Sequence, residues 1–301
     1  MRCAGALDLS CGYPRLLRNF VAFVEANEAT YITTELAVRW ARQPGDAQPA
    51  TWAARLGMVR RFASWRSGTD PRTEVPPQGL IPYRYYRTPP YIYRDDEIEG
   101  LIDAVSKLPS SNGLRASSYV TLFGLLAVTG MRVNEALMLD GEDVDLEGAI
   151  LSIRRTKFGK SRLVPVHSST GTALNHYAEA KARAFPRPPT RAFFLSERGT
   201  RITEWNARYT FAKVSQRIGL RAPAKGHGRG PRIHDMRHRF AAQTLIQWYR
   251  AGVDVERELP KLAAYLGHVH INETYWYLEA VPELLQLATK RLVEKAKEVG
   301  P

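Results

Sequence analysis

The sequence contains only two cysteines, Cys3 and Cys11, and both lie near its start. Two cysteines make neither a disulfide framework nor a cysteine-rich zinc site, so we interpret them as structural thiols. Long apolar runs are also missing, and nothing near Met1 resembles a secretion signal. These absences argue against a disulfide-stabilised secreted domain and against a membrane segment, and we expect a cytoplasmic protein.

Acidic residues are scarce relative to basic ones. The 43 Lys and Arg against 30 Asp and Glu leave a net charge of +13. A surplus of this size is most simply explained by a polyanionic partner, and nucleic acid is favoured over a membrane surface because there is no long apolar run. The composition therefore predicts a nucleic-acid-binding protein.

Proline is concentrated in one stretch, "DPRTEVPPQGLIPYRYYRTPPYIYR", which runs from Asp70 to Arg94. It holds six prolines, five tyrosines and four arginines, and no helical or strand period survives that density of proline. A chain of 301 residues suits two domains of ordinary size. We expect a first domain at residues 1–70, a linker at 71–94 and a second domain at 95–301.

Residues 1–70 show helical spacing. Apolar residues recur at three- and four-residue steps in segments 14–25 and 50–68, and Thr33 or Thr34 is placed to cap a helix between them. The predicted apolar faces consist of Leu16, Leu17, Phe20, Val21 and Val24 in the first helix and Trp52, Leu56, Val59, Phe62 and Ala63 in the last. The sequence thus predicts a small all-helical domain.

The second domain is predicted to be mostly helical with a small sheet at one edge. Asp95 can cap a helix, residues 117–130 are apolar nearly all round and indicate a central buried helix that ends at Gly130, and a short helix follows at 132–139. Two β-rich runs in "GAILSIRRTKFGKSRLVPV" flank a turn and predict a hairpin. With "DVDL" before them they predict a three-stranded antiparallel sheet, after which helical patterns return.

Four short stretches place residues suited to phosphate chemistry beside a turn or a helix start. They are "TGMRVNEAL", "RRTKFGKSRLVPV", "HDMRHRF" and "YLGHVHINETYWY". Each has an ordinary explanation by itself: Arg132 and Glu135 as a helical ion pair, Lys157 and Lys160 as surface lysines, and His268 at a helix end. It is their joint occurrence in this order that needs an explanation.

Together the four stretches resemble the tyrosine recombinase (phage integrase) family, whose members carry a T-G-x-R box, a hairpin lysine, an H-x-x-R box, an L-G-H box and a nucleophilic tyrosine. The resemblance covers about residues 91 to 290, and the helical domain and linker before it look like the family's core-binding domain. It implies a site-specific recombinase that cuts and rejoins DNA through a 3′-phosphotyrosine, without metal or ATP. The form of "YWYLEAVPELL" is most like recombinases carried by transposons and other mobile elements.

Carried over residue by residue, the resemblance assigns the catalytic set Arg132, Lys157, His234, Arg237, His268 and Tyr277. Tyr277 rather than Tyr275 is chosen because family members place the tyrosine nine positions after the L-G-H histidine. Glu135 matches the acidic residue that supports the first arginine, and His238 receives a supporting role beneath the site. Lys160 is the alternative to Lys157.

The assigned residues suit the chemistry that the resemblance implies. Two guanidinium forks can hold the non-bridging oxygens of a phosphodiester without any metal. A tyrosine hydroxyl is a poor nucleophile and needs a cationic surround or a base, for which His234 is the candidate. The leaving 5′ oxygen needs a proton, which Lys157 could supply.

Three alternatives stay open. His234, His268 and His270 could form a zinc site, although that interpretation leaves the arginines and Lys157 without a role. The chain could be a DNA-binding protein that keeps the fold without the chemistry, or a type IB-like topoisomerase.

Partners follow from the same resemblance. We expect double-stranded DNA recombination sites, a nucleoid-associated location, and a homotetramer on DNA formed by exchange of a C-terminal helix at about residues 283–299; partner recombinases or accessory proteins are left open. Residues proposed to contact DNA are Arg55, Arg60, Arg61, Arg84, Arg87, Lys225, Arg229 and Arg232. On the helical domain these arginines could equally form a solvated basic face.

Overall fold

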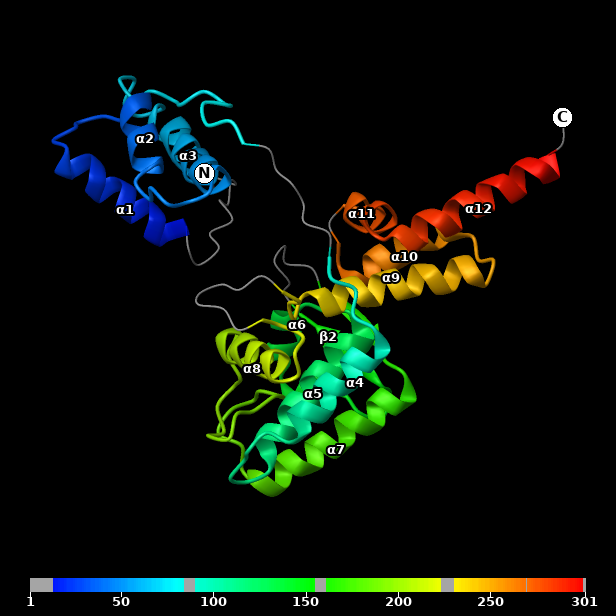
Figure 1. Cartoon of the computed structure of the whole chain (residues 1–301). Helices are drawn as coiled ribbons and strands as arrows, with labels where there is room; N and C mark the ends of the chain where they lie inside the picture. Colours follow the sequence, from blue (N-terminus) through cyan, green and yellow to red (C-terminus); the bar gives the residue numbers. More distant parts are fainter. Residues whose placement is uncertain (1–12, 84–89, 155–160, 223–229, 269, 300–301) are drawn as a thin grey trace. The chain divides into compact units, whose positions relative to one another are not determined.

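The computed structural model describes residues 13–83, 90–154, 161–222, 230–268 and 270–299. It forms two units, residues 1–88 and 89–301. Most of the described chain is helical, and one three-stranded antiparallel sheet accompanies the helices (Figure 1). The mainly helical fold class predicted from the sequence is therefore confirmed. Among the described residues, no helix is both long and apolar enough to cross a bilayer.

The first unit is built from α1 (Tyr13–Ala26), α2 (Thr34–Ala41) and α3 (Pro49–Arg66). Thr33 caps α2, since its hydroxyl accepts a hydrogen bond from the Leu36 amide at 3.1 Å. Phe20 and Trp40 meet edge to face at the centre of the core. One position was wrongly assigned to the buried face of α1, because Val21 is exposed and its neighbour Phe20 is buried.

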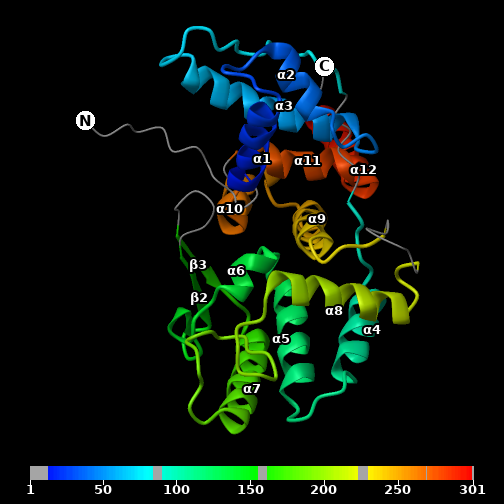
Figure 2. The same ribbon diagram turned by 90° about the vertical axis from the view of Figure 1, so that its left-hand side faces the viewer.

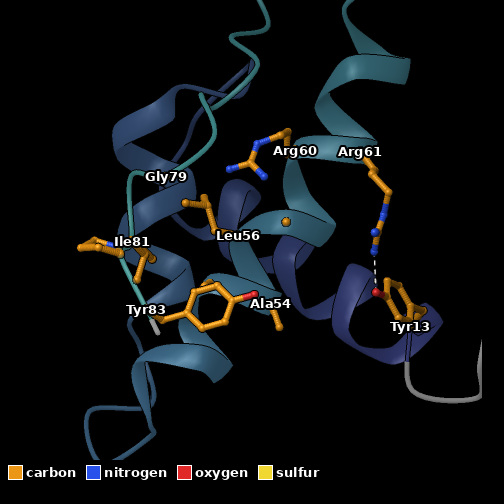
Figure 3. A pocket seen from close by; sticks show the side chains of 11 residues that line it. Tyr13, Ala54, Leu56, Arg60, Arg61, Gly79, Ile81 and Tyr83 are labelled. Atoms are coloured by element: carbon orange, nitrogen blue, oxygen red, sulfur yellow. Dashed lines mark hydrogen bonds between the residues drawn. The ribbon is translucent and has the colours of Figure 1, made fainter. Parts of the chain in front are cut away.

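The proline-rich stretch predicted as a linker contributes to both cores. Ile81 is buried in the core of the first unit, and Tyr93 is buried in that of the second. A pocket of about 740 Å³ lies between α3 and residues 79–83 (Figure 3). The predicted linker therefore contains residues packed in the first core before position 84 and in the second core after position 89.

The second unit is organised around α5 (Leu114–Thr129), which contacts α4 (Asp95–Ser106), α7 (Ser168–Ala184) and α9 (Asp235–Arg250). Leu122 and Phe123 on α5 are completely buried. Gly130 ends α5 in the left-handed conformation, with φ 61°. The prediction of a central apolar helix that stops at Gly130 is confirmed. The cap of α4 differs from the prediction, because Asp95 is its first residue and Arg94 is the cap, whose amide donates to Glu97.

The sheet consists of β1 (Val144–Asp145), β2 (Ile150–Ile153) and β3 (Arg162–Pro165), in that order, and it follows the short helix α6 (Val133–Leu137). Leu151 lies opposite Val164 in β3 and opposite Val144 in β1, and all three side chains are buried. The sheet lies at one side of the unit (Figure 2). Its apolar face therefore packs into the same core as α5.

The remaining helices are α8 (Glu204–Arg217), α10 (Val255–Leu266), α11 (Asn272–Ala280) and α12 (Pro282–Val299). Helices α9, α10, α11 and the start of α12 share a second cluster of buried side chains, which includes Leu245, Leu266, Tyr277 and Leu284. This cluster joins the segments that carry the predicted H-x-x-R, L-G-H and tyrosine motifs.

Candidate active site

The C-terminal end of α10 is the point on which the predicted site residues converge. Gly267 ends the helix with φ 70°, and the carbonyls of Ala263 and Ala264 are satisfied by backbone amides. The next three carbonyls each accept a hydrogen bond from a different arginine. Arg162 Nε donates to Tyr265 at 2.8 Å, Arg237 Nη2 donates to Leu266 at 2.8 Å, and Arg132 Nη2 donates to Gly267 at 3.0 Å.

Two physical reasons favour guanidinium groups at this position. The last carbonyls of a helix lack partners within the helix and carry partial negative charge. Residue 267 must also be small, since a Cβ there would lie 2.7 Å from Arg162 Nη1. A glycine in the left-handed conformation meets both demands, because it ends the helix and leaves room for the arginines.

Arg237 is the most deeply buried of the three, at 3% exposed, and it comes from the first turn of α9. Its Nη1 donates to the Gly130 carbonyl at 2.9 Å, so the end of α5 helps to hold it. Burial, followed by the charge of Arg132, lowers the pKa of Arg237 to about 10. The side chain therefore remains cationic at neutral pH and is fixed by backbone carbonyls on two sides.

Glu135 lies between the other two arginines. Its Oε1 accepts from Arg132 Nη1 at 2.9 Å, and its Oε2 accepts from Arg162 Nη2 at 2.7 Å. The same carboxylate accepts from the backbone amide of Arg132, which is the cap of α6. Burial alone would raise the pKa of Glu135, but the hydrogen bonds from Arg162 and Arg132 outweigh it and keep the pKa below its ordinary value. A charged Glu135 thus fixes Arg132.

Arg162 was not among the residues predicted for the site, although the sequence carried a signal for it. Side chains alternate across a strand, so Arg162 shares a face of β3 with Val164, which is buried. A cation on the inward face of a strand needs a buried partner. That partner is Glu135, and Arg162 thereby ties the hairpin to Arg132.

Two histidines and the predicted nucleophile lie close together. Tyr277, on α11, is 1% exposed, and its hydroxyl is 3.1 Å from His238 Nδ1. The ring of His268 stacks on that of Tyr277 with centroids 6.3 Å apart, and its Nδ1 is 2.7 Å from the Thr274 hydroxyl. The structure thus gives His238 a direct contact with Tyr277, which goes beyond the packing role expected from the sequence.

His234 is the cap residue of α9, and its ring meets that of His238 at a centroid distance of 4.9 Å. Burial, followed by the charge of Arg237, lowers the pKa of His234 to about 4. The imidazole is therefore neutral at physiological pH. Tyr275 is 41% exposed, which separates it clearly from the buried Tyr277.

The hairpin lysines and several basic residues assigned to DNA lie outside the described residues: Lys157, Lys160, Arg84, Arg87, Lys225 and Arg229. The others are tied to their own chain. Arg55 lies over the Trp40 ring, Arg60 donates to the carbonyls of Pro76 and Pro77, Arg61 donates to the Tyr13 hydroxyl (Figure 3), and Arg232 pairs with Asp235.

The zinc alternative finds no support in the described part of the chain, where no three His, Cys, Asp or Glu side chains are grouped as a metal site. His270, one member of the proposed triad, is exposed. His268 and His234 are instead engaged around Tyr277 and the arginines.

Comparison with known proteins agrees with this geometry. Residues 92–283 match the model of the phage integrase family. The protein y4rB of Sinorhizobium fredii, described as an integrase/recombinase, is 47% identical over 282 residues, which cover 92% of this chain and 89% of that protein. The extent of both matches shows that the chain belongs to the phage integrase family of tyrosine recombinases. It is a site-specific recombinase that cuts and rejoins DNA.

Two solved structures show the same fold at low sequence identity. The XerH recombinase, in a post-cleavage complex with palindromic difH DNA, aligns with a TM-score of 0.67 and 19% identity over 93% of this chain and 78% of its own. The Tn1549 transposon integrase, bound to transposon right end DNA, aligns with a TM-score of 0.63 and 15% identity over 97% of this chain and 96% of its own. Mainly helical units with one small sheet are thus shared with DNA recombinases.

The neutral state of His234 predicts a pH-dependent stability. Its pKa is lower in the folded chain than the ordinary value of 6.5, so the contribution to folding is complete above pH 6.5 and is lost as the pH falls towards 4. Between pH 7 and 5 we expect a loss of about 2 kcal/mol in unfolding free energy from this residue. Urea unfolding at several pH values measures this loss. The unfolding free energy of His234→Asn should fall less with decreasing pH than that of wild type, whereas His176→Asn, which changes an exposed histidine, should behave like wild type. An equal pH dependence in both variants would refute the assignment.

The triple role of Arg162 predicts that lysine cannot replace it. An ammonium cannot bond both oxygens of Glu135 and the Tyr265 carbonyl at once. Arg162→Lys should therefore lower the unfolding free energy by about 2 kcal/mol, because Glu135 loses part of its buried pairing. Thermal or urea unfolding measures this loss. The matched control is Arg183→Lys, on the exposed surface of α7, where a change below about 0.5 kcal/mol is expected; a similar loss in both would show that Arg162 is not special.

Proposed function

We propose that Tyr277 attacks the scissile phosphate and forms a 3′-phosphotyrosine, while Arg132 and Arg237 hold the non-bridging oxygens. The observation that carries this proposal is the convergence of the arginines on the C-terminal end of α10, with Tyr277 in the adjoining core cluster. Negative charge develops on the phosphate oxygens during in-line attack, and preorganised cations stabilise it. The ester conserves the bond energy, so rejoining needs no ATP.

Arg132 is the arginine best placed to meet the DNA. Its side chain is 34% exposed, against 13% for Arg162. A guanidinium has five N–H donors, and within the described residues one nitrogen of Arg132 bonds Glu135 and another bonds Gly267. The remaining donors can form a bidentate contact with a phosphate. Arg237 then contributes positive charge from the protein interior.

The two histidines of the predicted set complete the surroundings of the phosphate. His268 stacks on Tyr277, and its Nδ1 is paired with the Thr274 hydroxyl, which fixes the ring beside the proposed nucleophile. We propose, on the strength of the family motif, that this imidazole donates a hydrogen bond to the phosphate. Burial and the positive charges of Arg237 and Arg132 lower the pKa of His234, so its imidazole is neutral beside the proposed phosphate position. Lys157 is proposed as the general acid for the leaving 5′ oxygen, on the strength of the family motif. Because the Tyr277 hydroxyl is buried, DNA binding has to bring the phosphate and the hydroxyl together.

The DNA sites are proposed to be the ends of a mobile element, which the protein integrates or excises. The description of y4rB as an integrase/recombinase and the form of "YWYLEAVPELL" support this choice, whereas the fold is shared with both the Tn1549 integrase and XerH. Mapping the ends of the DNA that becomes covalently attached tests it. Attachment at the termini of an integrated element supports the proposal, and attachment at a replication-terminus site contradicts it.

The tyrosine assignment predicts the behaviour of two matched variants on a DNA site with a nick that traps the covalent product. Tyr277→Phe should give no attachment, because the phenol oxygen forms the ester bond. Tyr275→Phe should retain attachment, since this side chain is 41% exposed and lies outside the core cluster. Gel electrophoresis of the denatured protein–DNA product measures both.

Persistence of the adduct in Tyr277→Phe and its loss in Tyr275→Phe would overturn the assignment. EDTA added to the wild-type reaction should leave attachment unchanged, and inhibition by EDTA would favour a metal site instead.

Assembly into a tetramer is proposed to use the end of α12. The first part of the helix packs on its own unit, because Leu284 is completely buried and Arg291 donates to the Val253 carbonyl. Beyond Arg291 the helix continues to Val299, and the sequence keeps its apolar spacing at Leu292 and Ala296. An amphipathic helix can dock on a neighbouring copy, and head-to-tail docking closes a ring.

Deletion of residues 292–301 should abolish tetramers on paired DNA sites and leave binding to a single site intact. A deletion that began at residue 283 would also remove the buried Leu284, so it would not separate assembly from folding. Native gel electrophoresis with one and two DNA sites distinguishes the complexes. Tetramers that persist after the deletion would show that another surface joins the copies.

A further inference from the structure

The hydroxyl of Tyr277 and the imidazole of His238 form a buried hydrogen bond. The Oη and Nδ1 atoms are 3.1 Å apart, and the two residues are 1% and 7% exposed. Their rings are 5.5 Å apart between centroids, and the Trp276 ring packs against both, 5.5 Å from His238 and 5.4 Å from Tyr277. The histidine is therefore fixed in position by neighbours on α9 and α11.

The second nitrogen of His238 faces a carboxylate. Nε2 lies 4.0 Å from Asp235 Oδ1. Asp235 is 1% exposed and is itself held by Arg232, whose backbone amide and Nη2 donate to it at 2.7 and 2.8 Å. This separation is too long for a hydrogen bond, but a carboxylate on the Nε2 side electrostatically favours the tautomer with its proton on Nε2, in which Nδ1 accepts from the tyrosine.

This order of groups, hydroxyl, imidazole and buried carboxylate, is the arrangement that activates a weak hydroxyl nucleophile. We propose that His238 is the catalytic base that takes the proton of Tyr277, with Asp235 stabilising the imidazolium that results. The proposal rests on Tyr277 being the nucleophile, and it moves the role of base from His234, the candidate predicted from sequence, to its neighbour one turn along α9.

The proton and electron balance is complete within the site. The Tyr277 Oη–H bond breaks and its proton goes to His238 Nδ1, while the oxygen forms a bond to phosphorus. The bond from phosphorus to the 5′ oxygen breaks, and the 5′ oxygen takes a proton from the general acid, proposed as Lys157. In the rejoining step, the incoming 5′ hydroxyl gives its proton back to the general acid and its oxygen bonds to phosphorus. The bond from phosphorus to Oη breaks, and the imidazolium returns its proton to Oη.

The surroundings of His234 disfavour a positive charge there. Contacts of His238 within the described residues include His234 and Asp235 on α9 and Trp276 and Tyr277 on α11, and Asp235 is the carboxylate among them. His234 faces the positive charges of Arg237 and Arg132, and burial together with Arg237 lowers its pKa to about 4. Asp235 acts on His234 in the opposite direction, but burial and the arginines outweigh it there, which argues against His234 as the base.

The test compares single-turnover attachment to the nicked DNA site in three variants of the full chain. His238→Asn keeps a polar partner for Tyr277 without a basic nitrogen, and His238→Phe keeps the aromatic packing. Loss of a general base should slow both by about 10²- to 10⁴-fold. The His238→Asn rate should also rise from pH 7.5 to 9, where the wild-type rate is level, because hydroxide has to replace the base. Tyr277→Phe should give no attachment at all.

The failure of this proposal differs visibly from the failure of the proposed function. If Tyr277→Phe still attaches, the nucleophile itself is wrong. If Tyr277→Phe is inactive but His238→Asn attaches within about threefold of wild type, or is slower with the wild-type pH profile, His238 is not the base. Binding to a single DNA site, measured on the same preparations, reports whether each variant is folded.

A second measurement changes the acidity of the phenol, in the wild-type and the His238→Asn backgrounds. Tyr277→3,5-difluorotyrosine makes the phenol more acidic, so its need for a base falls. In the wild-type background this change should alter the attachment rate by less than about threefold, and in His238→Asn it should restore at least about tenfold. A wild-type background that gains as much as His238→Asn, or a His238→Asn that gains nothing, would overturn the proposal.

Discussion

Three successive carbonyls at the end of α10 hold three arginines, and the geometry of the site depends on this contact. A helix end presents carbonyls without internal partners, and Gly267 both ends the helix and leaves room for the guanidinium groups. The three arginines come from β3, α9 and the start of α6. One backbone segment therefore sets the mutual positions of side chains that lie up to 105 residues apart, as shown by the separation of Arg132 and Arg237.

Close packing of like charges is possible here because each cation has anionic or dipolar partners. Arg132 and Arg162 share the Glu135 carboxylate, while Arg237 is held by carbonyls of Gly130 and Leu266. The partly exposed Arg132 is therefore held in one position by its own protein partners, which is the preorganisation that the proposed phosphate contact needs. The cationic cluster also explains why the neutral form of His234 is favoured, since another positive charge there would lack compensation.

Tyr277 lies in the hydrophobic cluster of the C-terminal helices α9, α10, α11 and α12, and its hydroxyl meets His238 rather than open solvent. The core that stabilises these helices thus also holds the proposed nucleophile. Leu284 of α12 belongs to the same cluster, so the helix proposed for assembly begins in the core that contains Tyr277.

The sequence alone determined the helical class, the three-stranded sheet, the end of α5 at Gly130 and the family, because local periodicity, glycine positions and motif order are properties of neighbouring residues. It also singled out Arg132, Glu135 and Arg237, which the structure brings together. Tertiary structure decided what depends on distant contacts. Arg162 became a site residue only through its pairing with Glu135 across 27 positions, and the Tyr277–His238 bond spans 39. No local pattern specifies which of two neighbouring histidines faces a tyrosine; the packing of α11 on α9 does.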